Sequence, residues 1–220
     1  MTNIYINGLS GKMGSSICDI ATNDETISIV NDINESDVVI DFSRPGSSLK
    51  VLNKCVNYKK PLLIGTTGFN ENQIETIVKA SKEIPILLSF NMSKGIFILK
   101  KSIKDFLSSN ELSLECIIEE VHHKNKVDSP SGTAIELQRF IKENNISNNV
   151  TSINIKSKRT LDVFGIHKVV FFNNSENIEF KHEALSRKVF ATGAVNIAKL
   201  ILKNEPKLYT TEHFFNAKYL

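Results

Sequence analysis

The sequence predicts an α/β protein in which an N-terminal parallel sheet precedes a second domain built on a mixed sheet. In the first 95 residues, short apolar runs alternate with segments of helical periodicity. This alternation is typical of a parallel sheet covered by helices on both faces. After Gly95, runs rich in strand formers follow one another with one helix between them, which indicates a mixed or antiparallel sheet.

The elements of the first half follow from the spacing of apolar residues. Five short apolar runs are predicted to be strands, over 4–7, 27–30, 38–40, 62–64 and 86–88. Helical spacing predicts helices over 13–21, 49–56 and 71–81, with Pro45-Gly46 as a turn before the second of them.

The second half is predicted to hold longer strands. They cover 112–121, 150–157, 167–172 and 177–184, and helices are predicted over 96–107, 133–142 and 189–202. No internal repeat or low-complexity tract interrupts this pattern.

Composition limits the classes of protein that the chain can be. A chain of 220 residues with 41% hydrophobic residues can bury one large core or two small ones. The net charge is only +3 and is spread along the chain, which argues against a nucleic-acid binder. The N-terminus lacks the pattern of a signal peptide, and no apolar run approaches the roughly 18 residues of a membrane span. Cys18, Cys55 and Cys116 lie far apart, so we expect free thiols and a cytoplasmic protein without a membrane partner.

A glycine motif, Gly8-x-x-Gly11-x-x-Gly14, lies between the first predicted strand and the first predicted helix. Glycine permits the tight turn and the close approach of a pyrophosphate, and the helix N-terminus offers N–H groups and a positive dipole end. The context favours a dinucleotide site on a Rossmann-type unit, although an ordinary glycine-rich turn is the simpler alternative.

Asp32 follows the second strand, where an acidic residue would bind the ribose hydroxyls of the dinucleotide. A strand-end turn aspartate is the alternative. Ile33 and Asn34 come next instead of a basic residue, which weakens the case for a 2′-phosphate clamp, with Lys12 as a substitute cation.

Three further strand ends carry polar or small residues, at 41–45, 65–69 and 89–93. Ligands of open α/β sheets lie over the carboxyl ends of the strands. We therefore expect Gly65, Thr66 and Thr67 at the nicotinamide ribose and Ser89-Phe90-Asn91-Met92 at the nicotinamide face, with plain loop chemistry as the alternative.

The segment from Glu119 to Ala134 is the most informative stretch of the chain. Two histidines and two lysines gather at the end of an apolar strand, and Pro-Ser-Gly-Thr then leads into a helix. Ser131-Gly132-Thr133 at a helix N-terminus favours a carboxylate, Lys126 supplies a charge and a proton, and a histidine exchanges protons near neutral pH. A surface loop, a metal site and a simple helix cap are the alternatives, but no third metal ligand has suitable spacing.

Taken together, these motifs resemble the 4-hydroxy-tetrahydrodipicolinate reductase (dihydrodipicolinate reductase) family of the diaminopimelate route to lysine. The resemblance covers nearly the whole chain. It is carried by Gly8-x-x-Gly11-Lys12-Met13-Gly14, Val39-Ile40-Asp41-Phe42-Ser43-Arg44-Pro45, Gly65-Thr66-Thr67-Gly68, Asn91-x-Ser93-x-Gly95, His122-His123-x-x-Lys126-x-Asp128-x-Pro130-Ser131-Gly132-Thr133-Ala134 and His182-x-Ala184-x-Ser186-Arg187-x-x-Phe190-Ala191-x-Gly193-Ala194.

The resemblance implies a homotetrameric, cytoplasmic NAD(P)H-dependent oxidoreductase of amino-acid biosynthesis. It would reduce 4-hydroxy-tetrahydrodipicolinate to tetrahydrodipicolinate with loss of water, and we favour NADH over NADPH. It implies His122 as the general acid/base, Lys126 as the proton donor, and His123, Lys126, Gly132 and Thr133 as holders of the dicarboxylate substrate, with no metal. It implies these dinucleotide contacts: Gly8, Leu9, Ser10, Gly11, Lys12, Met13, Asp32, Gly65, Thr66, Thr67, Ser89, Phe90, Asn91 and Met92.

The resemblance also implies the division into domains. Residues 1–95 and 188–220 would form the dinucleotide-binding Rossmann domain, and 96–187 an inserted α+β domain that binds substrate and tetramerises through its mixed sheet. Two departures stand out: the chain is short between 27 and 38, and Leu161 replaces the first glycine of an Arg-x-Gly-x-x-x-Gly-x-His stretch at 159–167.

Other classes of protein remain as alternatives. A non-catalytic dinucleotide sensor would have lost the proton donors, yet His122, His123 and Lys126 are all present. A reductase of another imine or keto dicarboxylate would read its substrate through the same carboxylate-binding groups. A bare interaction module would have no use for three ligand-facing strand ends.

Overall fold

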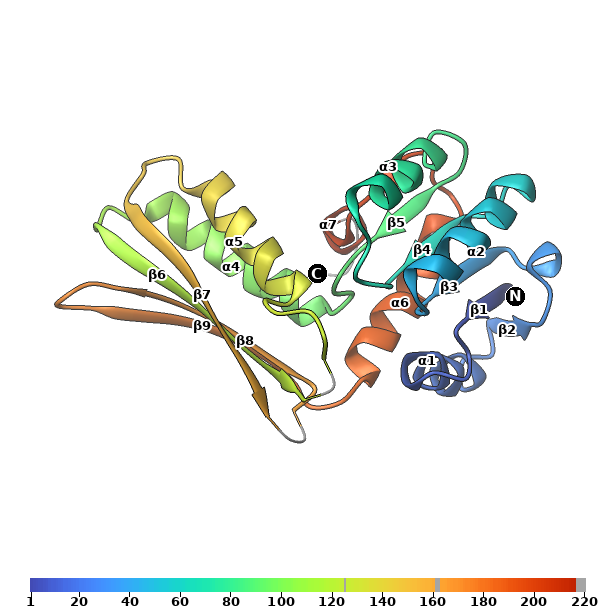
Figure 1. Cartoon of the computed structure of the whole chain (residues 1–220), viewed down its shortest axis with the longest axis horizontal. Coiled ribbons are helices and arrows are strands. Elements are labelled where there is room, and N and C mark those ends of the chain that lie inside the picture. Colours follow the sequence, from blue (N-terminus) through green and yellow to red (C-terminus); the bar gives the residue numbers. More distant parts are fainter. Residues whose placement is uncertain (125, 161–162, 217–220) are drawn as a thin grey trace. The chain divides into compact units, whose positions relative to one another are not determined.

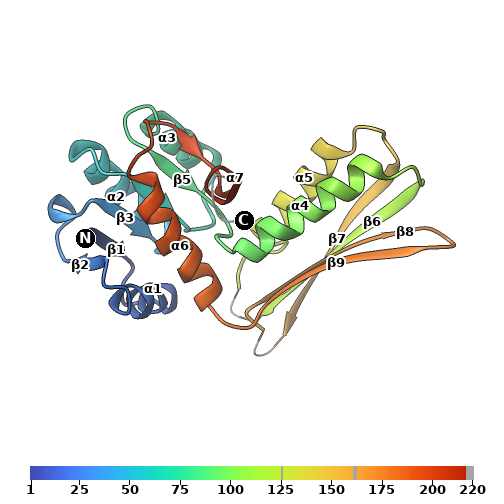
Figure 2. The same ribbon diagram turned by 180° about the vertical axis from the view of Figure 1, so that it is seen from behind.

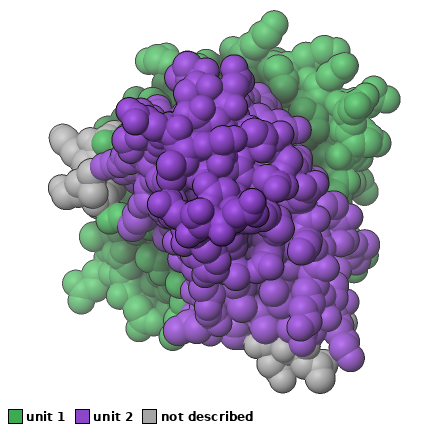
Figure 3. Space-filling view, turned by 90° about the vertical axis from the view of Figure 1, so that its left-hand side faces the viewer, with its two compact units in different colours: residues 1–94, 187–220 green, residues 95–186 purple. Residues whose placement is uncertain are grey.

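The computed structural model describes residues 1–124, 126–160 and 163–216. The chain divides into two compact units, coloured separately in Figure 3: unit 1 comprises 1–94 and 187–220, and unit 2 comprises 95–186. Each boundary lies one residue before the expected one. The binding roles assigned to the two domains remain predictions.

Unit 1 is built on a six-stranded sheet in the order β10-β5-β4-β3-β1-β2, and every neighbouring pair is parallel. The carboxyl ends of its strands therefore share one edge of the sheet. The strands are β1 (Thr2–Asn7), β2 (Ile27–Val30), β3 (Val38–Asp41), β4 (Leu62–Ile64), β5 (Ile86–Leu88) and β10 (Leu208–Tyr209). The central strands β3 and β4 are buried at every residue, as a sheet covered on both faces requires.

Two pairs of helices cover this sheet. Helix α1 packs against α6 and α2 packs against α3, and Figure 2 shows α6 in front of the sheet with α2 behind it. The unit also holds a short 3₁₀ helix, η1, and the terminal helix α7. Their bounds are α1 (Lys12–Thr22), η1 (Ile33–Glu35), α2 (Pro45–Asn57), α3 (Glu71–Ala80), α6 (Lys188–Ile201) and α7 (Thr211–Asn216).

The start of α2 corrects the sequence prediction. Pro45-Gly46 was expected to be a turn, but Pro45 is the first residue of the helix. The first turn of a helix does not use its N–H groups, and the fixed φ of proline suits that position. The helix is therefore four residues longer at its start than the apolar periodicity indicates.

Unit 2 contains a mixed four-stranded sheet in the order β7-β6-β8-β9. Strand β6 runs parallel to β7 and antiparallel to β8, which in turn is antiparallel to β9. Helices α4 and α5 lie side by side on one face of this sheet (Figure 1). The elements are α4 (Lys94–Ser109), β6 (Leu114–His123), α5 (Gly132–Asn144), β7 (Val150–Thr160), β8 (Gly165–Phe172) and β9 (Asn177–Ala184).

Strand β6 contributes apolar side chains to the core of unit 2 at its start and polar side chains at its end. Its burial alternates strictly, so that Leu114, Cys116, Ile118, Glu120 and His122 all face inward. The strand ends two residues later than predicted, and both adjacent histidines therefore belong to it. Glu120 and His122 continue a row of apolar side chains, which places two ionisable groups against the interior.

The cysteines and the helices bear on two earlier expectations. All three cysteines are free, and burial raises the pKa of the Cys55 and Cys116 thiols to about 12. In the described part of the chain, no helix is both long and apolar enough to cross a bilayer. The cytoplasmic location remains a prediction.

Candidate active site

The glycine turn between β1 and α1 is packed too closely for any other residue at two of its positions. Gly8 has a φ of +88°, and a Cβ there would lie 2.6 Å from the carbonyl oxygen of Phe42. A Cβ on Gly14 would lie 2.2 Å from the carbonyl oxygen of Gly8. The turn closes through a 2.9 Å hydrogen bond from the Gly11 N–H to that same oxygen. The helix therefore begins directly against the end of the strand.

This turn fits the pyrophosphate of a dinucleotide. Gly11 is the N-cap of α1 and makes no side-chain cap, and the first turn of the helix holds no acidic residue. Its N–H groups and positive dipole end are thus available to an anion, as the predicted dinucleotide contact requires. Leu9, Ser10, Gly11 and Lys12 are exposed around it, and Met13 is half-buried.

A buried carboxylate ties together the strand ends beside this turn. Asp41 ends β3 with no solvent exposure. It accepts hydrogen bonds from the Asn7 amide at 2.6 Å, the Ser43 hydroxyl at 2.5 Å, the Thr66 hydroxyl at 2.9 Å and the Ser48 hydroxyl. These donors come from β1, the loop after β3, the loop after β4 and helix α2. Asp41 therefore fixes the edge of the sheet where the dinucleotide is expected.

The side chain of Thr66, a predicted dinucleotide contact, is bonded to Asp41. The Thr66 hydroxyl donates to Asp41 and accepts from the Ser43 N–H at 2.9 Å, and the residue is 4% exposed. Its side chain thus holds the loop, and a bound ligand would meet its backbone. Gly65 is equally constrained, since a Cβ there would lie 2.1 Å from the ring of Phe42. Thr67 is half-buried in the same loop.

The segment after β5 is a tight polar turn. The Ser89 hydroxyl donates to the Asn91 carbonyl at 2.9 Å, and the Asn91 side-chain oxygen accepts from the Ser93 N–H at 2.9 Å. Phe90 is 41% exposed, whereas Met92 is 1% exposed. A Cβ on Gly193 of α6 would lie 1.7 Å from the Met92 carbonyl oxygen. Met92 therefore seats the turn on α6, and Phe90 is the side chain open to a ligand.

Asp32 lies just beyond β2 on the same edge of the sheet and is exposed. One of its carboxylate oxygens accepts from the Asn34 N–H at 2.9 Å and caps η1. The predicted ribose-binding residue is thus placed at a strand end and is also a helix cap.

In unit 2, a second buried carboxylate is hydrogen-bonded to residues of the segment from Glu119 to Ala134. Glu120 on β6 is fully buried and accepts from Nη1 of Arg159 at 2.9 and 3.0 Å. It also accepts from the Ser131 N–H at 3.2 Å and is hydrogen-bonded to Nδ1 of His122. Nη2 of Arg159 donates in turn to the Asp128 carbonyl at 2.5 Å. One carboxylate is therefore linked to the predicted acid/base, the start of α5 and the lysine-bearing loop.

The electrostatics of this pair follow from burial and hydrogen bonding. Burial favours the protonated form of Glu120, but hydrogen bonds from Ser157, His122 and Arg159 outweigh it and lower its pKa. Burial lowers the pKa of His122, although the Glu120 carboxylate opposes that change and the positive charge of Lys126 reinforces it. The favoured state near neutral pH is an ionised Glu120 beside a neutral His122.

A second histidine supports the N-terminus of α5. His167 on β8 is 2% exposed, and burial together with nearby positive groups lowers its pKa to about 3. Its Nε2 lies 3.3 Å from the Ser131 hydroxyl oxygen, which also accepts from the Ala134 N–H at 3.3 Å. His167 is neutral, and its contact with the Ser131 hydroxyl holds the cap of α5 in place whichever of the two groups is the donor.

The predicted anion-binding groups converge on one internal carboxylate. Asp128 contacts the Lys126 ammonium at 2.8 Å through one oxygen and accepts from the Gly132 N–H at 3.3 Å through the other. Hydrogen bonds from these groups lower its pKa in spite of burial. The structure therefore brings Lys126 and Gly132 within reach of a single carboxylate, which is the chemistry predicted for the substrate.

The remaining predicted residues are placed less directly. His123 follows His122 on β6, so the two side chains leave opposite faces of the strand. Thr133 is buried in the first turn of α5. Leu161, the departure noted in the sequence, lies outside the described residues. Arg159 and His167 at either end of that stretch belong to β7 and β8, and they contact Glu120, Asp128 and Ser131 of the segment from Glu119 to Ala134.

Sequence reasoning missed the residues that organise both clusters. Asp41 was noted as part of a polar strand end and of a family motif but was given no role, and neither were Glu120, Arg159 and His167. A signal for Glu120 was present, since it continues the alternation of Cys116 and Ile118 into His122. A carboxylate at a buried strand position needs strong partners. Across the described residues, no group of three histidine, cysteine or acidic side chains is arranged to hold a metal ion.

Comparison with known proteins shows the family to which the chain belongs. Models of the N-terminal and C-terminal parts of dihydrodipicolinate reductase match residues 29–92 and 95–215. A 4-hydroxy-tetrahydrodipicolinate reductase of Alkaliphilus oremlandii is 34% identical, and the match covers 97% of this chain and 98% of that protein. The chain belongs to the dihydrodipicolinate reductase family.

Other relatives agree with this assignment. The reductase of Thermosipho africanus with the same name is 36% identical over 97% of each chain. Among solved structures, a dipicolinate-bound dihydrodipicolinate reductase from Paenisporosarcina sp. TG-14 superposes with a TM-score of 0.74. It is 19% identical and covers 99% of this chain and 100% of its own, so it supports the fold. The chain is therefore an NAD(P)H-dependent oxidoreductase with a nicotinamide cofactor and the two-part α/β fold of its family.

Proposed function

We propose that His122 and Lys126 carry the proton transfers of the reaction of this family, in which 4-hydroxy-tetrahydrodipicolinate is reduced to tetrahydrodipicolinate in lysine biosynthesis. The observation that supports this most strongly is the meeting of Lys126 and Gly132 on one carboxylate beside a buried His122–Glu120 pair. A dicarboxylate substrate would take the place of Asp128 on these groups.

The chemistry requires proton transfer as well as a hydride. A bound nicotinamide supplies the hydride. Loss of water needs a group that takes up a proton and a group that protonates the leaving hydroxyl. Addition of the hydride then needs one proton for the product, which the group that took up a proton would return. His122, neutral and held at Nδ1, offers Nε2 as the proton acceptor, and the Lys126 ammonium is the donor. His123 and Thr133 would complete the grip on the carboxylates.

The dinucleotide would lie on the carboxyl edge of the unit 1 sheet. Its pyrophosphate would meet Gly8 to Met13, its ribose Asp32, and its nicotinamide end the segments 65–67 and 89–92. We propose NADH as the preferred form, because the exposed carboxylate of Asp32 disfavours a 2′-phosphate and no basic residue follows it. Lys12 is the exposed cation that would support NADPH instead.

The assembly is proposed to be a cytoplasmic homotetramer formed through the mixed sheet. What supports this is the face of the sheet opposite α4 and α5. On it, Ile117, Val170 and Phe172 are only half-buried, and they alternate with charged residues such as Glu119 and Lys168. Apolar positions of this kind fit a partner sheet.

A coupled spectrophotometric assay tests the reaction. The hydroxylated substrate is generated in place from pyruvate and aspartate semialdehyde by the preceding synthase, and loss of nicotinamide absorbance is followed with NADH and NADPH separately. We expect protein-dependent oxidation of both, faster with NADH. Silence with both, in protein shown to bind dinucleotide, would point to another imine dicarboxylate or to a sensor.

A further inference from the structure

We propose that Glu120 is the positioning residue of this enzyme: it sets the tautomer of His122 and holds the lysine-bearing loop and the start of α5 around it. The inference rests on the proposed function for its kinetic consequences, but not for its structural ones. It begins from a fully buried carboxylate that accepts hydrogen bonds from Arg159 and the Ser131 N–H and is hydrogen-bonded to His122.

Glu120 determines which ring nitrogen of His122 carries the proton. Glu120 is ionised and can only accept hydrogen bonds, so the Nδ1 atom of His122 that contacts it must carry the proton. Because His122 is favoured in its neutral form, its Nε2 then has a free lone pair. A histidine in water prefers the opposite tautomer, so the carboxylate selects the form that can accept a proton at Nε2.

A glycine lies beside Nε2 of His122. A Cβ placed on Gly165 would lie 3.1 Å from Nε2 of His122 and 3.4 Å from its Cδ2. Gly165 is the first residue of β8, and its lack of a side chain leaves the lone pair of Nε2 uncrowded on that side. Glu120 therefore fixes the Nδ1 side of the ring, and Gly165 leaves space beside Nε2.

Glu120 also holds groups other than His122. Strand pairing aligns Glu120 with Ser157 on β7 and with His167 on β8, and aligns His122 with Arg159. Arg159 contacts both oxygens of Glu120 through Nη1 and the Asp128 carbonyl through Nη2. The loop that carries Lys126 is thereby tied to the same carboxylate as His122, and the Ser131 N–H fixes the start of α5 to it.

A carboxylate with this role acts differently from a merely structural ion pair. Loss of a structural pair lowers stability and leaves the protonation of His122 alone. Loss of a positioning carboxylate changes which nitrogen of His122 carries the proton and removes the negative charge that favours the imidazolium. The pH dependence of kcat and the nitrogen chemical shifts of His122 therefore separate the two roles.

The first measurement uses the wild-type protein alone. Nitrogen-15 NMR of histidine-labelled protein, with His122 assigned by its absence in His122→Gln, reports the protonated nitrogen at neutral pH. We expect the Nδ1–H form. A His122 in the Nε2–H form would overturn the proposal, and this result does not depend on any variant folding or on any activity.

The second measurement uses Glu120→Gln, which keeps the shape but replaces one acceptor oxygen by an amide that faces other donors. We expect kcat to fall by about 100-fold, within the range contributed by general acid–base groups. We also expect the limb of the pH profile that reports His122 to move to lower pH, because the negative charge that raised its pKa is gone. The dinucleotide KM should stay within about 2-fold, because Glu120 and the groups hydrogen-bonded to it belong to unit 2, whereas the predicted dinucleotide residues belong to unit 1. An unchanged limb and kcat would overturn the proposal.

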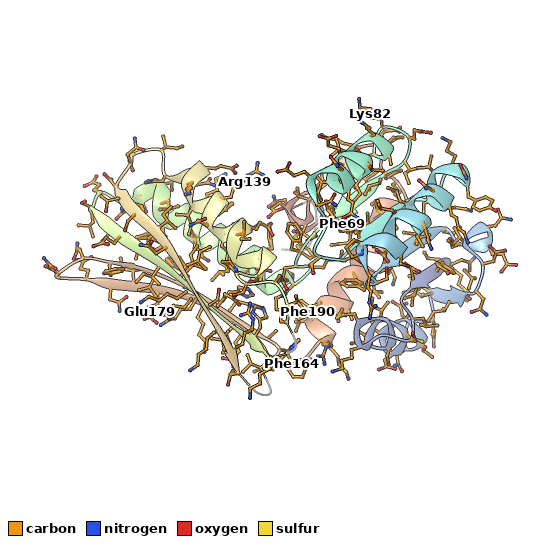
Figure 4. The ribbon with its side chains drawn as sticks, in the orientation of Figure 1. Phe69, Lys82, Arg139, Phe164, Glu179 and Phe190 are labelled. Carbon is orange, nitrogen blue, oxygen red and sulfur yellow. The ribbon has the colours of Figure 1, made fainter. Side chains whose placement is uncertain are left out.

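Two further variants complete the test. Glu143→Gln is the matched control, because Glu143 pairs with Arg139 on the exposed side of α5, where Arg139 points outward (Figure 4). It should behave as wild type.

Arg159→Lys keeps the charge but cannot bridge Glu120 and Asp128. The His122 tautomer should therefore persist while the substrate KM rises about 10-fold, as for other supporting residues. A changed tautomer or an unchanged KM in Arg159→Lys would contradict the bridging role.

The failures of the two proposals are distinguishable. If wild-type protein does not turn over the substrate but shows His122 as Nδ1–H, and Glu120→Gln shifts it to Nε2–H, then the reaction assignment fails and the positioning role stands. If turnover is normal and the tautomer does not respond to Glu120→Gln, the positioning role fails and the reaction stands.

Discussion

At the scale of single residues, Gly165 is the position where the smallest change should reach the chemistry. Its backbone does not need glycine for conformational reasons, but an added methyl group would crowd Nε2 of His122 at 3.1 Å. We expect Gly165→Ala to lower kcat by about 10-fold, a cost comparable to 1.4 kcal/mol of transition-state stabilisation. Dinucleotide affinity, measured by fluorescence titration, should not change. A fully active Gly165→Ala would show that the space beside Nε2 is unused.

His167 should make stability depend on pH. Its pKa is about 3 in the folded protein, against about 6.5 when unfolded, because burial disfavours its protonation and the charges of Lys126 and of protonated His122 and His182 repel it. Between these values the unfolded chain binds more protons, so the free energy of unfolding falls as the pH falls from 6.5 toward 3. One group contributes a slope of at most about 1.4 kcal/mol per pH unit.

The variant His167→Gln isolates this contribution. Urea unfolding of the variant and the wild type at several pH values should give a shallower dependence for the variant in that window. Parallel curves for the two proteins would mean that His167 titrates normally, and its support of the Ser131 cap would then need another explanation.

At the scale of elements, the junction of β1 and α1 depends on one glycine. A Cβ on Gly14 would overlap the carbonyl oxygen of Gly8 and lie 2.6 Å from the Cα of Leu9. We expect Gly14→Ala to push α1 away from the strand, to cost about 1–3 kcal/mol of stability and to weaken dinucleotide binding. Thermal unfolding and a fluorescence titration with NADH would measure both effects.

Gly46 provides the matched control for this substitution. It also lies in the first turn of a helix, α2, but no atom lies within 4 Å of a Cβ placed there. Gly46→Ala should leave binding unchanged and raise stability slightly, because alanine is the better helix former. If both variants behaved alike, close packing at Gly14 would not be what holds the turn.

Apolar periodicity predicted the longer elements because each spans enough residues to show its period. The three-residue strands β4 and β5 were predicted from continuous apolar runs. The elements that were missed, η1, β10 and α7, contain neither three consecutive apolar residues nor enough residues to show a helical period. The interior of the candidate site was harder to predict. Glu120 lies in the buried phase of β6, but its partners Arg159 and His167 come from β7 and β8. The register of those strands with β6 is not encoded in any local pattern.

At the scale of the whole molecule, the open face of the unit 2 sheet should decide the oligomeric state. Val170 lies on that face between Ile117 of β6 and Glu179 of β9. If the sheet is the tetramer interface, Val170→Asp buries an unpaired charge there and should dissociate the assembly. Light scattering should then fall from four times the chain mass of 24.6 kDa to a smaller multiple. A wild-type monomer, or a Val170→Asp tetramer, would exclude this interface.

We propose that the proton chemistry of the enzyme lies in the cluster around His122 and Lys126. The most direct test is the steady-state rate of His122→Ala and Lys126→Ala in the coupled assay, with NADH binding measured on the same samples. We predict that each variant loses about 10²- to 10⁴-fold in kcat, the range of a general acid–base group, while it binds NADH as the wild type does. Near wild-type rates in both variants would contradict these roles and place the proton chemistry elsewhere.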